Sequence, residues 1–388
     1  MVKAIRNCPY LYAESGGNTR NLHVIFSEKC MRNNRYLIIL LTAVMLFSLT
    51  ACNALTPIEG DEAAAAPEPS SFPTPTPAPV ETIGQVRVLC DSASGMAQAL
   101  IRKAQEDRLP VELIVTEFKD DADAVLALDV DSADIVICTG GMTGLGDGSI
   151  FVPIAYSAYV LAVNDTALKS SGFTDSAFSS MESLFDAARQ CGESKGKAFF
   201  AVDSYTELFA YCMRQLGELF TGEFDTENES FVHIYNLIAE AAFTGGVADT
   251  SNALASVRNG DCVCAAVPAA SLTDADISTL RILPLPMMKN GSRIHSGICT
   301  GYAVLREGEA VKAAADWLML GETTMQLALS VRAVPSVCTD KTPEDALSAA
   351  LCDISKTCTL AALNVEAYSE NAEQFENDFR AAMEMLTE

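Results

Sequence analysis

The sequences QVRVLC at residues 85–90 and ADIVIC at residues 133–138 decide the fold that we expect. Each is a short run rich in β-branched and other apolar residues. Asp91-Ser-Ala-Ser-Gly95 follows the first run, and Thr139-Gly-Gly141 follows the second. Apolar runs that stop at small and polar residues in this way are typical of buried strands.

Helix and strand patterns alternate between these two runs. From Met96 to Ala104, apolar residues recur at helical spacing, and Pro110 ends that pattern. Residues 111–116 then predict another strand, and residues 123–130 predict a short helix. The order strand, helix, strand, helix, strand predicts a parallel sheet covered by helices, and therefore an α/β fold.

A second block of alternating elements begins near Tyr159. Ser179 with Glu182, and Ser204 with Glu207, have the spacing of capping boxes and predict two helix starts. We expect strands at residues 197–202, 261–267, 281–285 and 299–305. We expect further helices at residues 229–243, 251–259, 309–320, 322–333, 343–363 and 372–386.

The N-terminal part of the chain carries an export signal. Residues 37–49 form an uncharged apolar run, with Arg32 and Arg35 ahead of it and Leu49-Thr-Ala-Cys52 at its end. This arrangement is similar to a bacterial lipoprotein signal, which implies cleavage before Cys52, lipidation of Cys52 and a place on the outer face of the cell membrane. A transmembrane anchor is the alternative, but the run is shorter than the roughly 20 residues that span a bilayer.

The signal and a linker precede the folded part of the chain. We assign the signal to residues 31–51, with Met31 as the initiator, because residues 1–30 have mixed charge and no apolar run. Residues 1–30 would then be a misassigned extension. Residues 52–83 are rich in proline, alanine and threonine, which predicts an extended spacer between the lipid and the folded domain.

The charge of the chain argues against two classes of partner. It has 26 Lys and Arg against 51 Asp and Glu, and residues 1–51 hold six of the former and two of the latter. The remainder therefore has a net charge of −29. Such an acidic chain disfavours nucleic acid and adhesion to anionic headgroups, so we expect the lipid on Cys52 to anchor it.

The cysteines do not have the spacing of a metal site. Three of the thirteen precede the folded domain: Cys8, Cys30 and Cys52. Most of the others lie in apolar periodic segments, where a free cysteine packs as a small hydrophobe. One disulfide within the C-terminal trio stays open: Cys338, Cys352 and Cys358. Cys262 and Cys264 form the closest pair without the usual ligand spacing, so we expect no metal and no cofactor.

Several stretches resemble one protein family. The segment Ala133–Ile137 is similar to the strand that closes the opening unit of that family's first lobe, and residues 261–271 resemble a strand and loop of the second lobe. Residues 313–320, followed by residues 322–335, resemble its C-terminal stretch. Together with the export signal, they make the chain similar to the extracellular solute-binding proteins of ABC importers over about residues 84–340.

The resemblance implies a fold and a mode of action. The fold is the type II periplasmic-binding fold, in which crossover strands join two doubly wound lobes that close on a ligand. The first lobe would comprise residues 84–157 and 296–335, and the second residues 158–295 and 336–388. The implied partners are a small-molecule solute and an ABC permease, and no catalytic residue is implied.

The predicted binding residues follow from where such sheets bind ligands, beyond the carboxyl ends of their strands. Helix N-termini, glycine turns and tyrosines near the crossover can all contact a ligand there. The ligand-binding residues that we predict are Asp91, Ser92, Ser94, Thr139, Gly140, Gly141, Tyr156, Tyr159, Asp203, Ser204, Tyr205 and Thr244. Helix capping, turn formation or core packing is the competing explanation at these positions.

The chemistry of the solute and the competing functions follow from a few residues. Trp317, the single tryptophan, lies among Ala and Leu at helical spacing and is predicted to be core, which puts a sugar ligand in doubt. The candidate loops contain aspartate but little Lys or Arg, which slightly favours a neutral or cationic solute. A sensor or scaffold of the same fold is one alternative. An enzyme with Cys90 or Cys138 as nucleophile is another, although no histidine is close in sequence to activate either.

Overall fold

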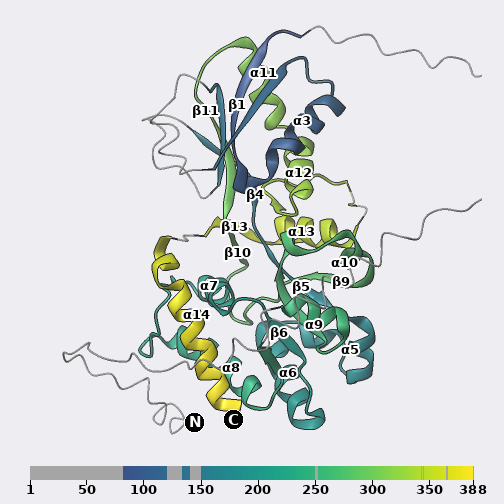
Figure 1. Cartoon of the computed structure of the whole chain (residues 1–388), viewed down its shortest axis with the longest axis vertical. Coiled ribbons are helices and arrows are strands. Elements are labelled where there is room, and N and C mark those ends of the chain that lie inside the picture. Colours follow the sequence, from purple (N-terminus) through teal and green to yellow (C-terminus); the bar gives the residue numbers. More distant parts are fainter. Residues whose placement is uncertain are drawn as a thin grey trace, which may run out of the picture. The chain divides into compact units, whose positions relative to one another are not determined.

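The structure, a computed structural model, describes residues 82–119, 133–139, 150–249, 252–341, 343, 345–363 and 366–387. Within these residues the strands form a six-stranded, a five-stranded and a two-stranded sheet (Figure 1). We call the six-stranded sheet with its helices the first lobe and the five-stranded sheet with its helices the second lobe. The α/β prediction is confirmed, whereas the signal, the linker and the predicted helix at 123–130 lie outside the described residues.

The sheet of the first lobe has the strand order β12-β4-β11-β3-β1-β2. Its strands are β1 (Gln85–Asp91), β2 (Glu112–Phe118), β3 (Ile135–Thr139), β4 (Phe151–Tyr156), β11 (Cys299–Val304) and β12 (Val334–Pro335). β1 pairs in parallel with β2 and β3, as predicted, and β11 runs antiparallel between β3 and β4. The carboxyl ends of β1, β3 and β4 therefore lie at one edge of this sheet.

Helices cover this sheet because each has one apolar stripe. They are the 3₁₀ turn η2 (Ser92–Ser94), α3 (Met96–Glu106), α11 (Glu309–Leu318) and α12 (Gly321–Ser330). Met96 and Leu100 of α3 pack in the same buried cluster as Ile137 of β3 and Trp317 of α11. The Trp317 side chain is 6% exposed, and its indole N–H donates a 2.8 Å hydrogen bond to Asp107. The prediction that Trp317 is a core residue is confirmed.

The sheet of the second lobe has the strand order β7-β6-β8-β5-β9. Its strands are β5 (Tyr159–Val163), β6 (Phe200–Val202), β7 (Val247–Asp249), β8 (Cys264–Pro268) and β9 (Arg281–Pro284). β6 pairs in parallel with β7 and β8, whereas β5 runs antiparallel to β8 and β9. The carboxyl ends of β6, β7 and β8 thus share an edge with the start of β5.

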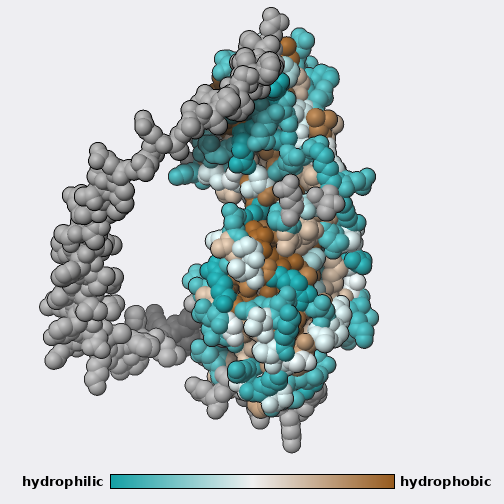
Figure 2. Space-filling model, turned by 90° about the vertical axis from the view of Figure 1, so that its right-hand side faces the viewer, coloured by the Kyte–Doolittle hydropathy of each residue, from teal (hydrophilic) through white to brown (hydrophobic). Residues whose placement is uncertain are grey.

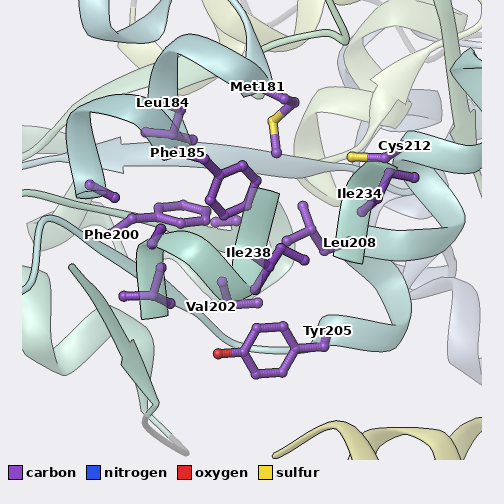
Figure 3. Close-up of a cluster of buried hydrophobic side chains, with 14 of the residues drawn as sticks. Met181, Leu184, Phe185, Phe200, Val202, Tyr205, Leu208, Cys212, Ile234 and Ile238 are labelled. Carbon is purple, nitrogen blue, oxygen red and sulfur yellow. The ribbon is translucent and has the colours of Figure 1, made fainter. Parts of the chain in front are cut away.

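The second lobe has a large aromatic core. Its helices are α5 (Asp165–Ser171), η4 (Asp175–Phe178), α6 (Met181–Lys195), α7 (Tyr205–Gln215), α8 (Glu229–Phe243), α9 (Ala253–Asn259), η5 (Ala269–Ser271), α10 (Asp274–Thr279) and α14 (Glu366–Thr387). Figure 3 shows Phe185 of α6 and Phe200 of β6 packed together, with ring centroids 5.5 Å apart. Phe375 and Phe379 of α14 join the same cluster. The C-terminal helix is therefore part of this core.

Two segments cross between the lobes side by side. Ser157 and Ala158 connect β4 to β5, while Ile298 connects β10 (Ile294–Gly297) to β11. The backbone N–H of Ser157 donates to the carbonyl of Ile298 at 2.9 Å, and the Ser157 hydroxyl accepts from the backbone N–H of Ile298 at 2.8 Å. A Cβ atom at Gly297 would lie 2.1 Å from the Ser157 carbonyl oxygen, so the close approach of the two segments requires glycine there.

Two details of the predicted elements are wrong. Ser180, not Ser179, caps α6, because the Ser180 hydroxyl accepts from the backbone N–H of Ser183. The predicted helix at 343–363 is instead α13 (Ala346–Thr357) followed by β13 (Thr359–Ala362). β13 pairs in parallel with β10, and this long-range pairing leaves no periodic signal in a four-residue segment.

The surface of the described residues is more hydrophilic than the composition of the chain, of which 49% is hydrophobic. On the face drawn in Figure 2, hydrophilic residues cover most of the described surface, and hydrophobic residues gather at mid-height. No helix in the described part of the chain has both the length and the apolar character needed to cross a membrane.

Candidate ligand-binding site

Three strand ends form the candidate site in the first lobe. Asp91 ends β1, and its carboxylate accepts from the backbone N–H of Ala93 at 2.8 Å and from that of Thr139 at 3.2 Å. Thr139 ends β3, and its hydroxyl lies 3.5 Å from that of Thr300 on β11. Asp91 therefore links the carboxyl ends of two strands, and the two threonine hydroxyls lie beside it.

The two predicted serines after β1 have different surroundings. The Ser94 hydroxyl donates to the Asp91 carbonyl at 2.6 Å and accepts from the backbone N–H of Met96 at 3.2 Å. Because Ser94 is also buried, its hydroxyl stabilises the start of α3, and we leave Ser94 out of the proposed site. Ser92 is half-buried, and its carbonyl accepts from Gly95.

Two tyrosines flank the crossing segment. Tyr156 ends β4 and packs beside Cys299, and burial raises the pKa of its hydroxyl to about 12. Tyr159 begins β5, and its pKa is raised by burial and then by the nearby carboxylates of Glu207, Asp203 and Glu376. Both hydroxyls are therefore neutral hydrogen-bonding groups at physiological pH.

The candidate site in the second lobe lies where β6 ends and α7 begins. Ser204 caps α7, since its hydroxyl accepts from the backbone N–H of Glu207 at 3.3 Å. A carboxylate from the distant helix α14 also lies at this helix start. The Glu376 carboxylate accepts from the backbone N–H groups of Tyr205 at 3.2 Å and Thr206 at 2.8 Å, and from the hydroxyls of Ser204 and Thr206. The N–H groups that the sequence offers to a ligand are thus already bonded.

Arg380 completes the contact between α14 and α7. Its guanidinium pairs with Glu376 at 2.7 Å and donates to the Asp203 carbonyl at 3.0 Å. It also lies 5.1 Å from the centre of the Tyr205 ring, which packs on Phe379 at a centroid distance of 4.7 Å. Because Tyr205 is only 1% exposed, it is a core residue, and we leave it out of the proposed site.

Acidic side chains gather around this helix start. Burial raises the pKa of Asp203 and that of Glu207, and the Glu376 carboxylate adds to both shifts. The Tyr368 hydroxyl donates to Glu207 at 3.1 Å, and the backbone of Ala253 donates to Asp203. Because Arg380 is paired with Glu376, the carboxyl groups of Asp203 and Glu207 make this edge of the sheet acidic.

The remaining predicted residues lie elsewhere. Thr244 caps the end of α8, where its hydroxyl donates to the Ala241 carbonyl at 2.9 Å. It precedes β7 and so lies at the amino edge of the sheet, opposite Asp203, and we leave it out of the proposed site. Gly140, Gly141 and Cys52 lie outside the described residues.

Two cavities beside the second lobe do not coincide with these strand ends. One of about 870 Å³ is lined by residues that include Phe178, Leu283 and Lys289. Another of about 270 Å³ is lined by residues that include Ser296 and Tyr368. None of the predicted binding residues lines either cavity, so strand ends rather than cavity size define the candidate site.

Cys90 and Cys138, the two cysteines considered as nucleophiles, are both buried in the structure. Cys90 is fully buried, and burial raises the pKa of its thiol to about 11. Cys138 is also fully buried. A nucleophilic cysteine needs a lowered pKa and access to substrate. No group of three or more His, Cys, Asp and Glu in the described residues has an arrangement that could hold a metal ion.

Comparisons with known proteins identify the fold. No protein-family model and no curated protein sequence matches the chain. Among solved structures, a probable secreted solute-binding lipoprotein from Streptomyces coelicolor is similar, with a TM-score of 0.57 and 14% identity over 78% of this chain and 98% of that one. The GacH receptor of Streptomyces glaucescens GLA.O has a TM-score of 0.52 and 14% identity over 78% and 94% of the two chains.

A third similar structure is the galacto-N-biose-/lacto-N-biose I-binding protein of the ABC transporter from Bifidobacterium longum. It has a TM-score of 0.52 and 12% identity, covering 79% of this chain and 94% of that one. The chain therefore has the fold of the extracellular solute-binding proteins of ABC transporters, as the resemblance in the sequence predicted.

Sequence reasoning missed the contribution of α14. Glu376, Arg380 and Tyr368 all contact the start of α7 or its first turn. The sequence predicts a helix there, but nothing in its pattern says which distant helix it packs against. The apolar spacing of Tyr368, Phe375 and Phe379 was the signal for burial, while the partner depends on the tertiary fold.

Proposed function

We propose that this chain is an exported, lipid-anchored solute-binding protein that holds a small solute between its two lobes and delivers it to an ABC permease. One observation carries the proposal. Polar residues end the strands of both sheets at their carboxyl edges, with Asp91 and Thr139 in one lobe and Asp203 in the other. Ligands of open α/β sheets bind at such edges, and hinge closure around a ligand is the usual motion of this kind of protein.

A neutral or cationic solute fits this site best. Helix N-termini attract anions, but the Glu376 carboxylate lies at the start of α7. Asp203 and Glu207 add negative charge nearby. An anionic solute would meet these carboxylates, whereas hydroxyl or ammonium groups could donate to them. Tyr156 is buried in a core cluster, so we leave it out of the proposed site, whereas the neutral hydroxyl of the half-buried Tyr159 suits a polar, uncharged ligand equally well.

The chemistry of this site favours binding over catalysis. The raised pKa and full burial of Cys90 argue against a thiolate nucleophile. A sensor or scaffold that binds the same solute without transport is the second candidate, and it shares every feature of the site. Co-purification with a permease separates the two, because a scaffold would not require one.

A thermal-shift screen tests the proposal. The full-length chain, in detergent, is heated with sugars, amino acids, peptides, polyamines, vitamins and oxyanions. A ligand at 100 times its Kd adds about 2.7 kcal/mol of stability, a shift of several degrees. We expect a neutral or cationic compound to raise Tm. No shift across the panel with folded protein would contradict solute capture, and a shift with oxyanions alone would contradict the proposed solute class.

A further inference from the structure

One histidine is buried where the chain crosses between the lobes. His295 lies in β10, shortly before Gly297, and is only 2% exposed. Its Nε2 atom is 3.0 Å from the carbonyl oxygen of Ser157, in the other crossing segment. Because a carbonyl oxygen can only accept a hydrogen bond, Nε2 carries the proton and donates it to that bond. The His295 side chain therefore links the two crossing segments.

Ser157 is the point at which the two segments are joined. Its backbone N–H and its hydroxyl are both bonded to the backbone of Ile298, and its carbonyl accepts from His295. The backbone of Gly297 lies so close to this carbonyl that a Cβ atom would not fit. A displacement of the His295 ring from Ser157 would therefore disturb a tightly fitted pairing.

The surroundings of the ring suit a neutral imidazole. In the described part of the chain, Nδ1 has no hydrogen-bond partner. α7 presents the phenol of Tyr211, whose ring centroid is 6.2 Å away and whose hydroxyl donates to a carbonyl after β9. β13 places the apolar Leu360 opposite His295, and the β4–β5 link contributes the neutral Ser157. Arg293, an exposed cation, precedes β10. An imidazolium here would have an unbonded N–H and no counterion from these elements.

The paired and the opened crossing should bind a proton differently. Burial lowers the pKa of His295 below its ordinary value, and the hydrogen bond to Ser157 opposes that shift only in part. In an opened crossing, where the ring meets water, His295 would take up a proton near the usual pKa of about 6.5. Acid therefore favours the opened crossing, because that form binds the proton more readily.

We propose that His295 makes the crossing between the lobes sensitive to acid: protonation detaches its ring from Ser157 and loosens the pairing of the two crossing segments. The lobes of a two-lobed protein move about such connections, so acid would give the lobes more freedom. A protein on the outer face of a membrane meets the pH of the medium directly, and in this respect the inference rests on the proposed export.

His233 provides a matched control. It lies on α8, its side chain is 49% exposed, and its Nε2 atom is 3.7 Å from a carboxylate oxygen of Glu182. Because its ring already meets water, its protonation requires no opening of the structure. His233→Gln should therefore leave the acid response of the crossing unchanged.

Hydrogen exchange across a pH series tests the proposal. The full-length chain, in detergent, is exchanged between about pH 7.5 and about pH 5, above the range in which ordinary carboxylates titrate. Mass spectrometry measures the protection of peptides that contain Ser157 or Ile298, relative to intrinsic exchange rates. We expect protection to fall by up to about tenfold per pH unit below about pH 6.5 in the wild type and in His233→Gln.

The His295→Gln variant isolates the titrating group. Its amide can still donate to the Ser157 carbonyl but cannot be protonated, so protection of the crossing should stay constant over this range. Unchanged protection in the wild type, or an equal fall in His295→Gln, would overturn the proposal.

Nuclear magnetic resonance of the histidine rings keeps the proposal testable if His295→Gln does not fold. In the wild type, with signals assigned by means of His233→Gln, the His295 ring should titrate below the value of about 6.5 that is usual for histidine. Titration of His295 at or above that value would contradict the buried neutral ring. Neither measurement uses a solute, so failure here is distinct from failure of solute capture.

Discussion

A helix begins directly after a strand at the carboxyl edge of each sheet, but the two helix starts are stabilised differently. Ahead of α3, the stabilising residues come from the same loop: Asp91 caps the 3₁₀ turn η2, and the Ser94 hydroxyl accepts from the backbone N–H of Met96, the first residue of α3. At the start of α7, Ser204 is joined by Glu376, which is 172 residues further along the chain. The comparison shows that the sequence can predict a helix start that is capped by neighbouring residues. It cannot predict a helix start that is capped by a residue of a distant helix.

Removing the buried aromatic side chain of Phe379, which packs α14 against α7, should cause the largest loss of stability. Phe379 is fully buried and packs on Tyr205 and Phe209. Phe379→Ala should lower the free energy of unfolding by about 3–5 kcal/mol, measured by urea denaturation. Met385→Ala on the same helix is the control, since Met385 is exposed. Equal losses in the two variants would contradict the anchoring role of Phe379.

The remote cap itself is tested next. Glu376→Gln keeps the shape of the side chain but removes the charge that accepts from Tyr205 and Thr206 and pairs with Arg380. We expect stability to fall by about 1.5–3 kcal/mol, as for hydrogen bonds to charged groups. Glu373→Gln, an exposed position on α14, should be neutral. A stability loss at Glu373 matching that at Glu376 would argue against a specific cap.

The pH dependence should differ in sign between a locally capped helix and the acidic edge. Asp276, in the capping box of α10, is bonded by Arg258 at 2.6 Å, and its pKa is lowered to about 2. Its folded pKa lies below its unfolded value, so its contribution is present above about pH 4 and is lost as pH falls towards 2. Asp276→Asn should cost about 2 kcal/mol at pH 7 and nothing near pH 2.

Glu207 should show the opposite sign. Burial raises its pKa, so stability falls as pH rises through its unfolded value towards its higher folded value. Glu207→Gln should therefore raise stability at neutral pH and remove that part of the pH dependence. Urea denaturation across a pH series checks both variants, and a loss of stability for Glu207→Gln at pH 7 would contradict the raised pKa.

The smallest effect is expected at the locally capped edge. Asp91→Asn keeps one carbonyl oxygen for Ala93 or Thr139 but not the charge that serves both. Stability should fall by about 1 kcal/mol, as measured by thermal or urea denaturation. A larger fall than that of Glu376→Gln would reverse the order that the two edges predict.

Particular residues show which features of the fold and of the candidate site the sequence predicts. Local patterns predict the strands formed by QVRVLC and ADIVIC, the Ser204 cap and the core position of Trp317. Each of these features is present in the structure. The sequence also predicted Tyr205 as a ligand contact, although the tertiary fold buries its side chain against Phe379. Thr244 was predicted as a ligand contact because it lies in a turn, but the direction of β7 places it at the amino edge of the sheet. Burial and edge depend on long-range packing that local spacing does not encode.

The most direct test of the account measures whether one solute uses both edges. The compound that gives the largest thermal shift is titrated into wild type, Asp91→Asn and Asp203→Asn by calorimetry, with Asp186→Asn on α6 as the control. We predict that both edge variants bind at least about tenfold more weakly, or about 1.4 kcal/mol, and that the control binds like wild type. Unchanged affinity in either edge variant would contradict a solute held between the two lobes.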